Sequence, residues 1–65
     1  MALLEEVVKD LKQRIEEARE AVKAADKLVK FGEEAGIDIS EQKVKLASLK
    51  SDLERIERAF KKHFG

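Results

Sequence analysis

Few side chains in this sequence have the chemistry for catalysis or metal binding. His63 is the only histidine, and cysteine is absent. No acidic residue lies three or four positions before His63, so the sequence contains neither a paired-histidine zinc motif nor the Glu-x-x-His pattern of di-iron helical bundles. We therefore predict no metal site, and we interpret His63 as a residue at the C-terminal end of a helix, where a cation complements the helix dipole.

The other reactive groups also lack partners. The serines at 40, 48 and 51 have no histidine on the same helical face within a turn or two, so no activated nucleophile is predicted. The acidic pairs at 16–17 and 33–34 fall on or beside a polar face. Gly32 and Gly36 do not form a glycine-rich phosphate loop, and we interpret them as helix punctuation. The sequence predicts no catalytic residue, no cofactor and no enzymatic activity.

Composition points to a small helical domain. The chain has 65 residues, of which 43% are charged and 43% hydrophobic, with three glycines and no proline. The 14 basic residues balance the 14 acidic ones, so the net charge is zero and no nucleic-acid partner is expected. No apolar run approaches the ~20 residues that span a bilayer, and the N-terminal segment is acidic. We expect a soluble, cytoplasmic chain without a membrane partner.

The first half carries an unbroken seven-residue repeat, which predicts a helix from about residue 2 to residue 35. Its a and d positions are Leu4, Val8, Leu11, Ile15, Ala18, Val22, Ala25 and Val29. Val7, Ala21 and Leu28 occupy the neighbouring g position, while Leu3 and Phe31 lie at c. This stripe is wider than a two-stranded coiled coil requires, and it favours a bundle of more than two helices.

A matching repeat predicts a second helix from about residue 40 to residue 63. Its apolar seam consists of Leu46, Leu49, Leu53, Ile56 and Phe60, ends at His63, and is flanked by Ala59 and Phe64. Val44 and Ala47 form a separate apolar patch away from this seam. On the outward faces, acidic and basic residues four positions apart, such as Asp26 with Lys30 and Glu57 with Lys61, are expected to form pairs within each helix.

The residues between the two repeats predict a short turn at 36–39. Gly36 fits the left-handed position that ends a helix in a Schellman motif, with Ile37 folding back on Phe31. Gly32 occupies the next d position, where a missing side chain lets a neighbouring helix approach closely, and we expect the helix to continue through it; the alternative is a helix that frays from Phe31 onward. Ser40 is the expected N-cap of the second helix, with Ile39 and Val44 as a hydrophobic staple; Asp38 with Glu41 is an alternative capping box.

The sequence therefore predicts an all-α fold, an antiparallel helical hairpin that dimerises into a four-helix bundle. The first helix is longer by ~15 Å at ~1.5 Å per residue, so its N-terminal apolar residues overhang without a partner in the chain. In a dimer with turns at opposite ends, this overhang meets the turn of the second copy. The predicted interface comprises Leu3, Leu4, Val7, Val8, Leu11, Ile15, Val22, Val29, Phe31, Ile37, Val44, Leu46, Leu49, Leu53, Ile56, Phe60 and Phe64.

In length and hairpin form the chain resembles the Rop-type plasmid copy-control proteins, whose antiparallel four-helix dimers bind paired RNA loops. The turn "AGIDISE" at 35–41 resembles turns in helical hairpins of long archaeal proteins, and the charge-rich composition resembles thermophile and de novo designed proteins. We predict a structural, self-assembling module whose partner is a second copy. One alternative is a binding module for a partner's amphipathic helix, and a more remote one is Rop-like RNA binding, which the zero net charge disfavours.

Overall fold

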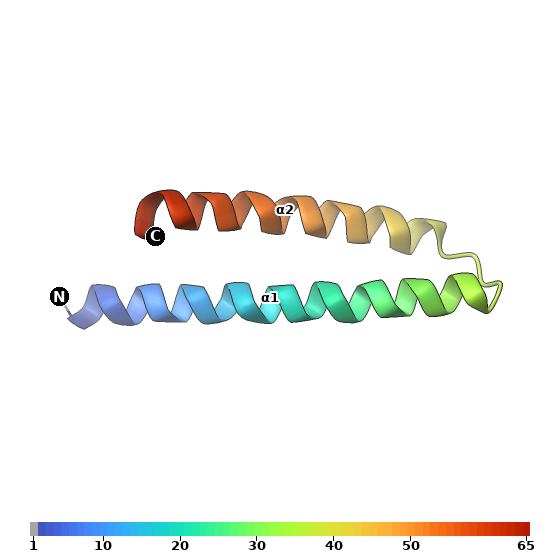
Figure 1. Cartoon of the computed structure of the whole chain (residues 1–65), viewed down its shortest axis with the longest axis horizontal. Helices are drawn as coiled ribbons and strands as arrows, with labels where there is room; N and C mark the ends of the chain where they lie inside the picture. The colour runs from blue at the N-terminus through green and yellow to red at the C-terminus, as the bar shows by residue number, and fades with distance from the viewer. Residues whose placement is uncertain (1) are drawn as a thin grey trace.

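The computed structural model describes the backbone of residues 2–65 and the side chains of residues 4–65. Two α-helices, α1 (Ala2–Glu34) and α2 (Ser40–Phe64), lie side by side and are joined by a tight turn, so that they run antiparallel (Figure 1). No strand occurs within residues 2–65. The prediction of an all-α helical hairpin is confirmed. The predicted bounds differ from the observed ones by one residue at the C-terminal end of each helix.

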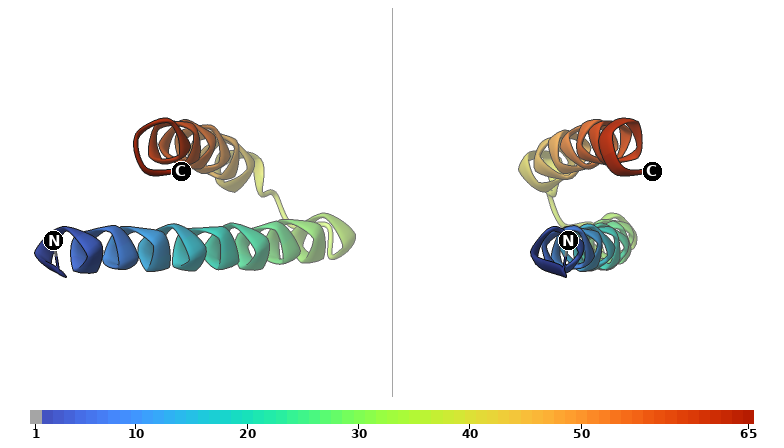
Figure 2. Two further views of the ribbon diagram at one scale, coloured as in Figure 1. Left: turned by 60° about the vertical axis from the view of Figure 1, so that its left-hand side comes forward. Right: turned by 90° about the vertical axis from the view of Figure 1, so that its left-hand side faces the viewer.

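The hairpin is elongated, with principal extents of 53 × 16 × 14 Å. Its radius of gyration is 15.4 Å, whereas a compact domain of 65 residues has one of about 11 Å. Helix α1 has 33 residues and α2 has 25, and the N-terminal end of α1 extends past the C-terminal end of α2 (Figures 1 and 2). The difference corresponds to roughly 12 Å of helix.

A Schellman motif ends α1. The amide of Gly36 donates to the carbonyl oxygen of Glu33 at 3.2 Å, and the amide of Ile37 donates to the carbonyl oxygen of Gly32 at 2.9 Å. Gly36 has a φ of +73°, the left-handed conformation that glycine adopts without steric cost. The chain is helical through Gly32, as the sequence predicted, and α1 ends just before Gly36, which takes the predicted left-handed position.

The start of α2 corrects the predicted cap. Ile39 is the N-cap residue and makes no side-chain capping bond, while Ser40 is already the first helical residue. Asp38 takes the capping role instead, because its Oδ1 accepts from the Ser40 backbone amide at 3.1 Å and from the Ser40 hydroxyl at 2.6 Å. These two bonds lower the pKa of the Asp38 carboxyl, the hydroxyl contributing most. The predicted staple is also wrong, since Val44 is 71% exposed.

Ile39 instead packs against α1 at Gly32. A β-carbon placed on Gly32 would lie only 2.6 Å from Cγ2 of Ile39. Gly32 is buried, and Ile39 is half-buried although it lies in the turn region. The missing side chain therefore allows a close approach, but Ile39 of the turn makes it, and the predicted approach of a neighbouring helix is wrong.

Three ion pairs join the helices and report their register. Arg19 contacts Glu57 at 2.7 Å, Asp26 contacts Lys50 at 3.2 Å, and Glu33 contacts Lys43 at 3.4 Å. The partners advance by seven residues along each helix in opposite directions, which is the spacing of one edge of an antiparallel heptad pair. The predicted pairs of Asp26 with Lys30 and Glu57 with Lys61 within their own helices are wrong, because Asp26 and Glu57 pair across the hairpin.

The core is very small. Leu46 is the only buried hydrophobic side chain among residues 4–65, with 6% of its surface exposed. Alternate seam residues around it are half-buried, namely Ile15, Val22, Val29, Leu53 and Phe60. The seam residues between them on α2 are exposed to solvent, since Leu49 is 54% and Ile56 50% exposed. Two helices thus bury one edge of the heptad stripe and leave the other edge in solvent.

Candidate interaction surface

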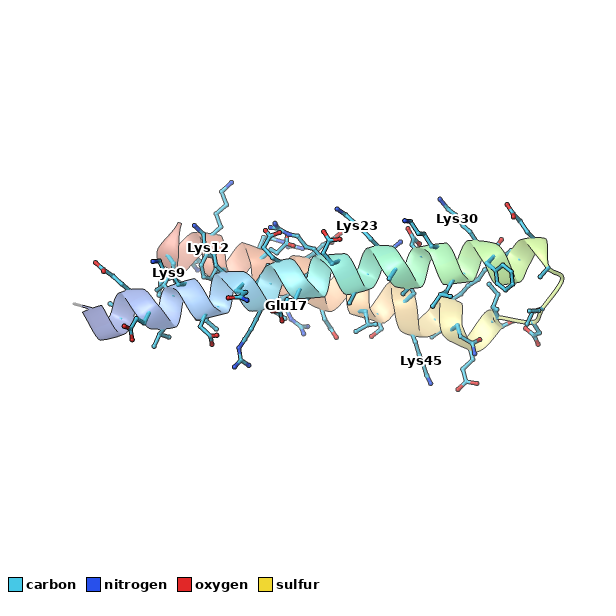
Figure 3. All side chains as sticks on the ribbon, turned by 90° about the horizontal axis from the view of Figure 1, so that it is seen from below. Lys9, Lys12, Glu17, Lys23, Lys30 and Lys45 are labelled. Atoms are coloured by element: carbon cyan, nitrogen blue, oxygen red, sulfur yellow. The ribbon has the colours of Figure 1, made fainter. Side chains whose placement is uncertain are left out.

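The hairpin has two different long faces. One carries the three interhelical ion pairs, and the other carries the exposed a, d and g residues of the heptad repeats. Lys12, Lys23 and Lys30 point to one side of the molecule and Lys45 to the opposite side (Figure 3). We call the face with the exposed a, d and g residues the apolar face, and define it by two grooves that run between the helices.

The turn-end groove lies between the C-terminal half of α1 and the N-terminal half of α2. Its volume is about 230 Å³, and its apolar lining is formed by Ala25, Leu28, Val29, Ile39, Leu46 and Leu49. Gln42 and Lys45 complete the lining. Leu28 is 69% exposed in spite of its size. Its g position was the sequence signal for this surface, although the predicted interface omitted it together with Ala25 and Ile39.

The open-end groove lies between the middle of α1 and the C-terminal half of α2. It has a volume of about 330 Å³, and its lining includes Leu11, Ile15, Ala18, Ile56, Phe60 and Phe64. The rings of Phe60 and Phe64 pack with centroids 5.3 Å apart. His63 and Arg14 also line this groove. His63 therefore lies beside apolar side chains at the end of the seam, as its spacing predicted.

The N-terminal overhang of α1 continues the apolar face beyond α2. Leu4 and Val7 are exposed, and Val8 is half-buried. Leu3, also a predicted interface residue, lies outside the side chains that the structure describes. Helix α2 ends at Phe64, which shares the open-end groove with Leu11, and α1 continues past this end of α2 toward its N-terminus (Figure 1).

The structure thus brings most of the predicted interface residues onto one face, but not all of them. Val44 lies two residues before Leu46, and residues two apart point about 200° away from each other on a helix. Val44 is therefore on the outer side of α2, away from both grooves. Phe31 and Ile37 lie near the turn, and both are exposed. Whether these residues form an interface stays a prediction.

The opposite face is polar and carries the interhelical ion pairs. Arg19 is its centre, because it contacts Glu57 across the hairpin and Glu16 within α1. The hydrogen bond that Arg19 donates to the Glu57 carboxylate, together with the charges of Glu16 and Glu57, raises the pKa of the Arg19 guanidinium. The side chains of its interhelical ion pairs are about a third to a half exposed.

Ion pairs within the helices are fewer than the sequence suggested. Asp10 with Arg14, Glu41 with Lys45 and Glu54 with Arg58 form at four-residue spacing, as expected. Further pairs form at three-residue spacing, including Lys23 with Glu20 and Arg55 with Asp52. All of these side chains are exposed or nearly so, and each pair contributes little beyond local helix support.

No arrangement for catalysis is visible among the described side chains. Within that part of the chain, no group of three or more His, Asp or Glu residues is placed to hold a metal ion. The Ser40 hydroxyl donates to Asp38 in the turn, so it serves the start of α2. His63 has aromatic neighbours, its ring centroid lying 6.4 Å from that of Phe64. What the described residues offer is an apolar surface.

Neither α1 nor α2, over residues 2–65, has a stretch long and apolar enough to cross a membrane. Comparison with known protein families, curated proteins and solved structures finds no match for this chain. The resemblance to Rop-type proteins therefore rests on hairpin architecture alone.

Proposed function

We propose that this chain is a structural self-assembly module, whose hairpins dimerise through the apolar face into a four-helix bundle. The observation that supports this most directly is the exposed area. The chain exposes 5693 Å², whereas a compact monomer of its 7.4 kDa mass exposes about 4,200 Å². The excess of about 1,500 Å² exceeds the roughly 800 Å² per partner of a standard protein interface.

The small core supports the same proposal. A chain of this size without a disulfide gains only about 3–5 kcal/mol from its own core at best, and here Leu46 is the only buried hydrophobic side chain among residues 4–65. Contact between two apolar faces would bury the remaining half of Leu49 and Ile56, which corresponds to about half of the roughly 1.5–3 kcal/mol that full burial of such a side chain contributes. Folding and association are then coupled, so the stability of the fold rises with protein concentration.

A second candidate function is the docking of a partner's amphipathic helix. The two grooves favour it, since they form a continuous apolar path between α1 and α2, and helix-in-groove binding uses such a path. Self-association uses the same surface. The two functions differ in what they require, because only the first needs no other molecule. Neither proposal involves catalysis.

Sedimentation equilibrium of the purified chain tests the proposal. We expect a dimer at micromolar concentration and a melting temperature that increases with concentration. Leu49→Lys places a charge on the apolar face, whereas Ser51→Lys adds the same charge two residues away on the outer side of α2. We expect the first variant to shift the chain toward monomer and the second to remain a dimer.

A stable monomer with a concentration-independent melting transition would contradict self-association. If that monomer became helical-bundle-like only on addition of an amphipathic peptide, the helix-docking function would replace it. Equal behaviour of Leu49→Lys and Ser51→Lys in a dimeric protein would show that another face mediates the contact.

A further inference from the structure

We propose that the N-terminal overhang of α1 from one copy occupies the turn-end groove of the other copy, so that the two turns lie at opposite ends of the dimer. This inference rests on the self-association proposed above and specifies its geometry. The occupant is thus a defined segment of a second copy of this chain, approximately residues 4–11.

The overhang and the turn-end groove both expose apolar side chains that lack a packing partner within the hairpin. The overhang presents Leu4 and Val7 to solvent with no α2 alongside. At the other end of the hairpin, the turn-end groove leaves Leu28 and Leu49 more than half exposed. Both belong to the apolar face, because each is built from a, d and g positions. One contact covers both.

Lengths also agree. The overhang corresponds to roughly 12 Å of helix. The groove extends along α1 from Ala25 to Val29, about 6 Å, and on its other side from Ile39, the residue before α2, to Leu49, about 15 Å. The length of the overhang lies between these two values.

Side-chain size along α1 favours the same pairing. The d positions run from large to small along the helix: Leu4, Leu11, Ala18, Ala25 and Gly32. When two α1 helices cross antiparallel and are centred on Ala18, Leu4 lies opposite Gly32 and Leu11 lies opposite Ala25. The small residues near the turn thus leave room for the large residues of the overhang. Leu4 of the second copy would contact Ile39 at this position, because Ile39 covers Gly32 and lines the groove.

The alternative dimer places both turns at the same end. In that arrangement each α1 lies over the shorter α2 of its partner, and Leu4 and Val7 of both copies remain exposed beyond the bundle. It also places the small d residues of the two copies at one end and the large ones at the other. The arrangement with opposite ends therefore buries more apolar surface with the same faces.

A distance measurement between spin labels distinguishes the two arrangements. The sequence has no cysteine, so Glu34→Cys gives a unique labelling site on the exposed last turn of α1, at the end where the turn lies. In the proposed dimer the two labels are separated by about 48 Å along the bundle, at 1.5 Å per residue. With both turns at one end they lie within about 30 Å, across two hairpins whose helices pack 8–10 Å apart.

A distance distribution centred near 48 Å supports the inference, and one centred below 30 Å overturns it while leaving self-association intact. Absence of any intermolecular distance, with a monomer in sedimentation, overturns both. Leu4→Asp, measured in the same labelled background, is expected to raise the dissociation constant of the dimer at least about tenfold. Glu6→Asp on the polar face of the overhang serves as its control and is expected to leave the dimer unchanged.

Discussion

Ile39 fills the space that Gly32 leaves on α1, with its Cγ2 atom 2.6 Å from where a β-carbon on Gly32 would lie. This contact ties the residue preceding α2 to the last turn of α1. The methyl belongs to a β-branched side chain whose χ1 is stiff, so it cannot move aside as the end of a long side chain could. The turn therefore depends on a glycine inside a helix, a position where glycine is otherwise unfavourable.

Gly32→Ala tests this relationship. Helix propensity alone would stabilise the variant by about 1 kcal/mol, but overpacking against Ile39 costs about 1–3 kcal/mol. We expect the free energy of unfolding, measured by urea denaturation at fixed protein concentration, to fall. In the Ile39→Ala background the clash is gone, and Gly32→Ala should then stabilise the fold by up to about 1 kcal/mol. Equal effects of Gly32→Ala in both backgrounds would contradict the contact.

The Asp26 and Lys50 pair tests the antiparallel register. Their contact at 3.2 Å joins α1 to α2, and both side chains are a little under half exposed. We expect Asp26→Lys and Lys50→Asp each to lower the free energy of unfolding, and the double exchange to recover about 0.2–1 kcal/mol relative to the sum of the two. Urea denaturation at low salt measures this coupling, and added salt should weaken it.

The same exchange on Glu54 and Arg58 is a matched control, because that pair lies within α2 at four-residue spacing. Its coupling should survive in any helical arrangement of α2. A coupling between Asp26 and Lys50 that is indistinguishable from zero, beside a measurable one for the control, would argue that the helices pair in another register.

Asp38 makes the start of α2 sensitive to acid. Two hydrogen bonds from Ser40 lower the pKa of its carboxyl below that of an aspartate in the unfolded chain, about 3.9. Asp38 therefore stabilises the fold above the unfolded-state pKa, and this stabilisation is lost as the pH falls through the folded-state pKa. We expect Asp38→Ala to lower the melting temperature at pH 7 and to have progressively less effect below about pH 4.

Circular dichroism melts of the two proteins from pH 7 to pH 2.5, at one protein concentration, measure this difference. Ser40→Ala removes the hydroxyl but retains the backbone donor, so its effect should be smaller and should have the same pH dependence. A difference between wild type and Asp38→Ala that stays constant to pH 2.5 would show that the carboxylate charge is not involved.

Sequence periodicity was sufficient for the helices, for the stop at Gly36 and for the face that stays open, because these depend on local geometry and on spacing along one chain. It was insufficient where two helices meet. Asp26 has a suitable partner at Lys30, and only the register of the hairpin turns it toward Lys50. Likewise, Ser40 is a good N-cap by residue type, but in the hairpin Ile39 is the N-cap residue, packed against Gly32, and the Asp38 carboxylate accepts from the Ser40 amide.

The overhang of α1 should contribute to association of the chain more than to the stability of one hairpin. Leu4 and Val7 have no α2 residue alongside, so replacing both with serine removes little from the hairpin itself. If they are buried in a dimer, each replacement removes about half of the roughly 1.5–3 kcal/mol of full side-chain burial in each copy, because the hairpin leaves Leu4 59% and Val7 51% exposed. We expect the Leu4→Ser/Val7→Ser dimer to dissociate at concentrations at least about tenfold higher, the equivalent of 1.4 kcal/mol. Glu6→Ser/Lys9→Ser, on the polar side of the same turns, should leave the dissociation constant unchanged in sedimentation equilibrium. Equal weakening by both pairs would indicate a loss of helix at the N-terminus, and no weakening by either would place the contact between copies elsewhere on the apolar face.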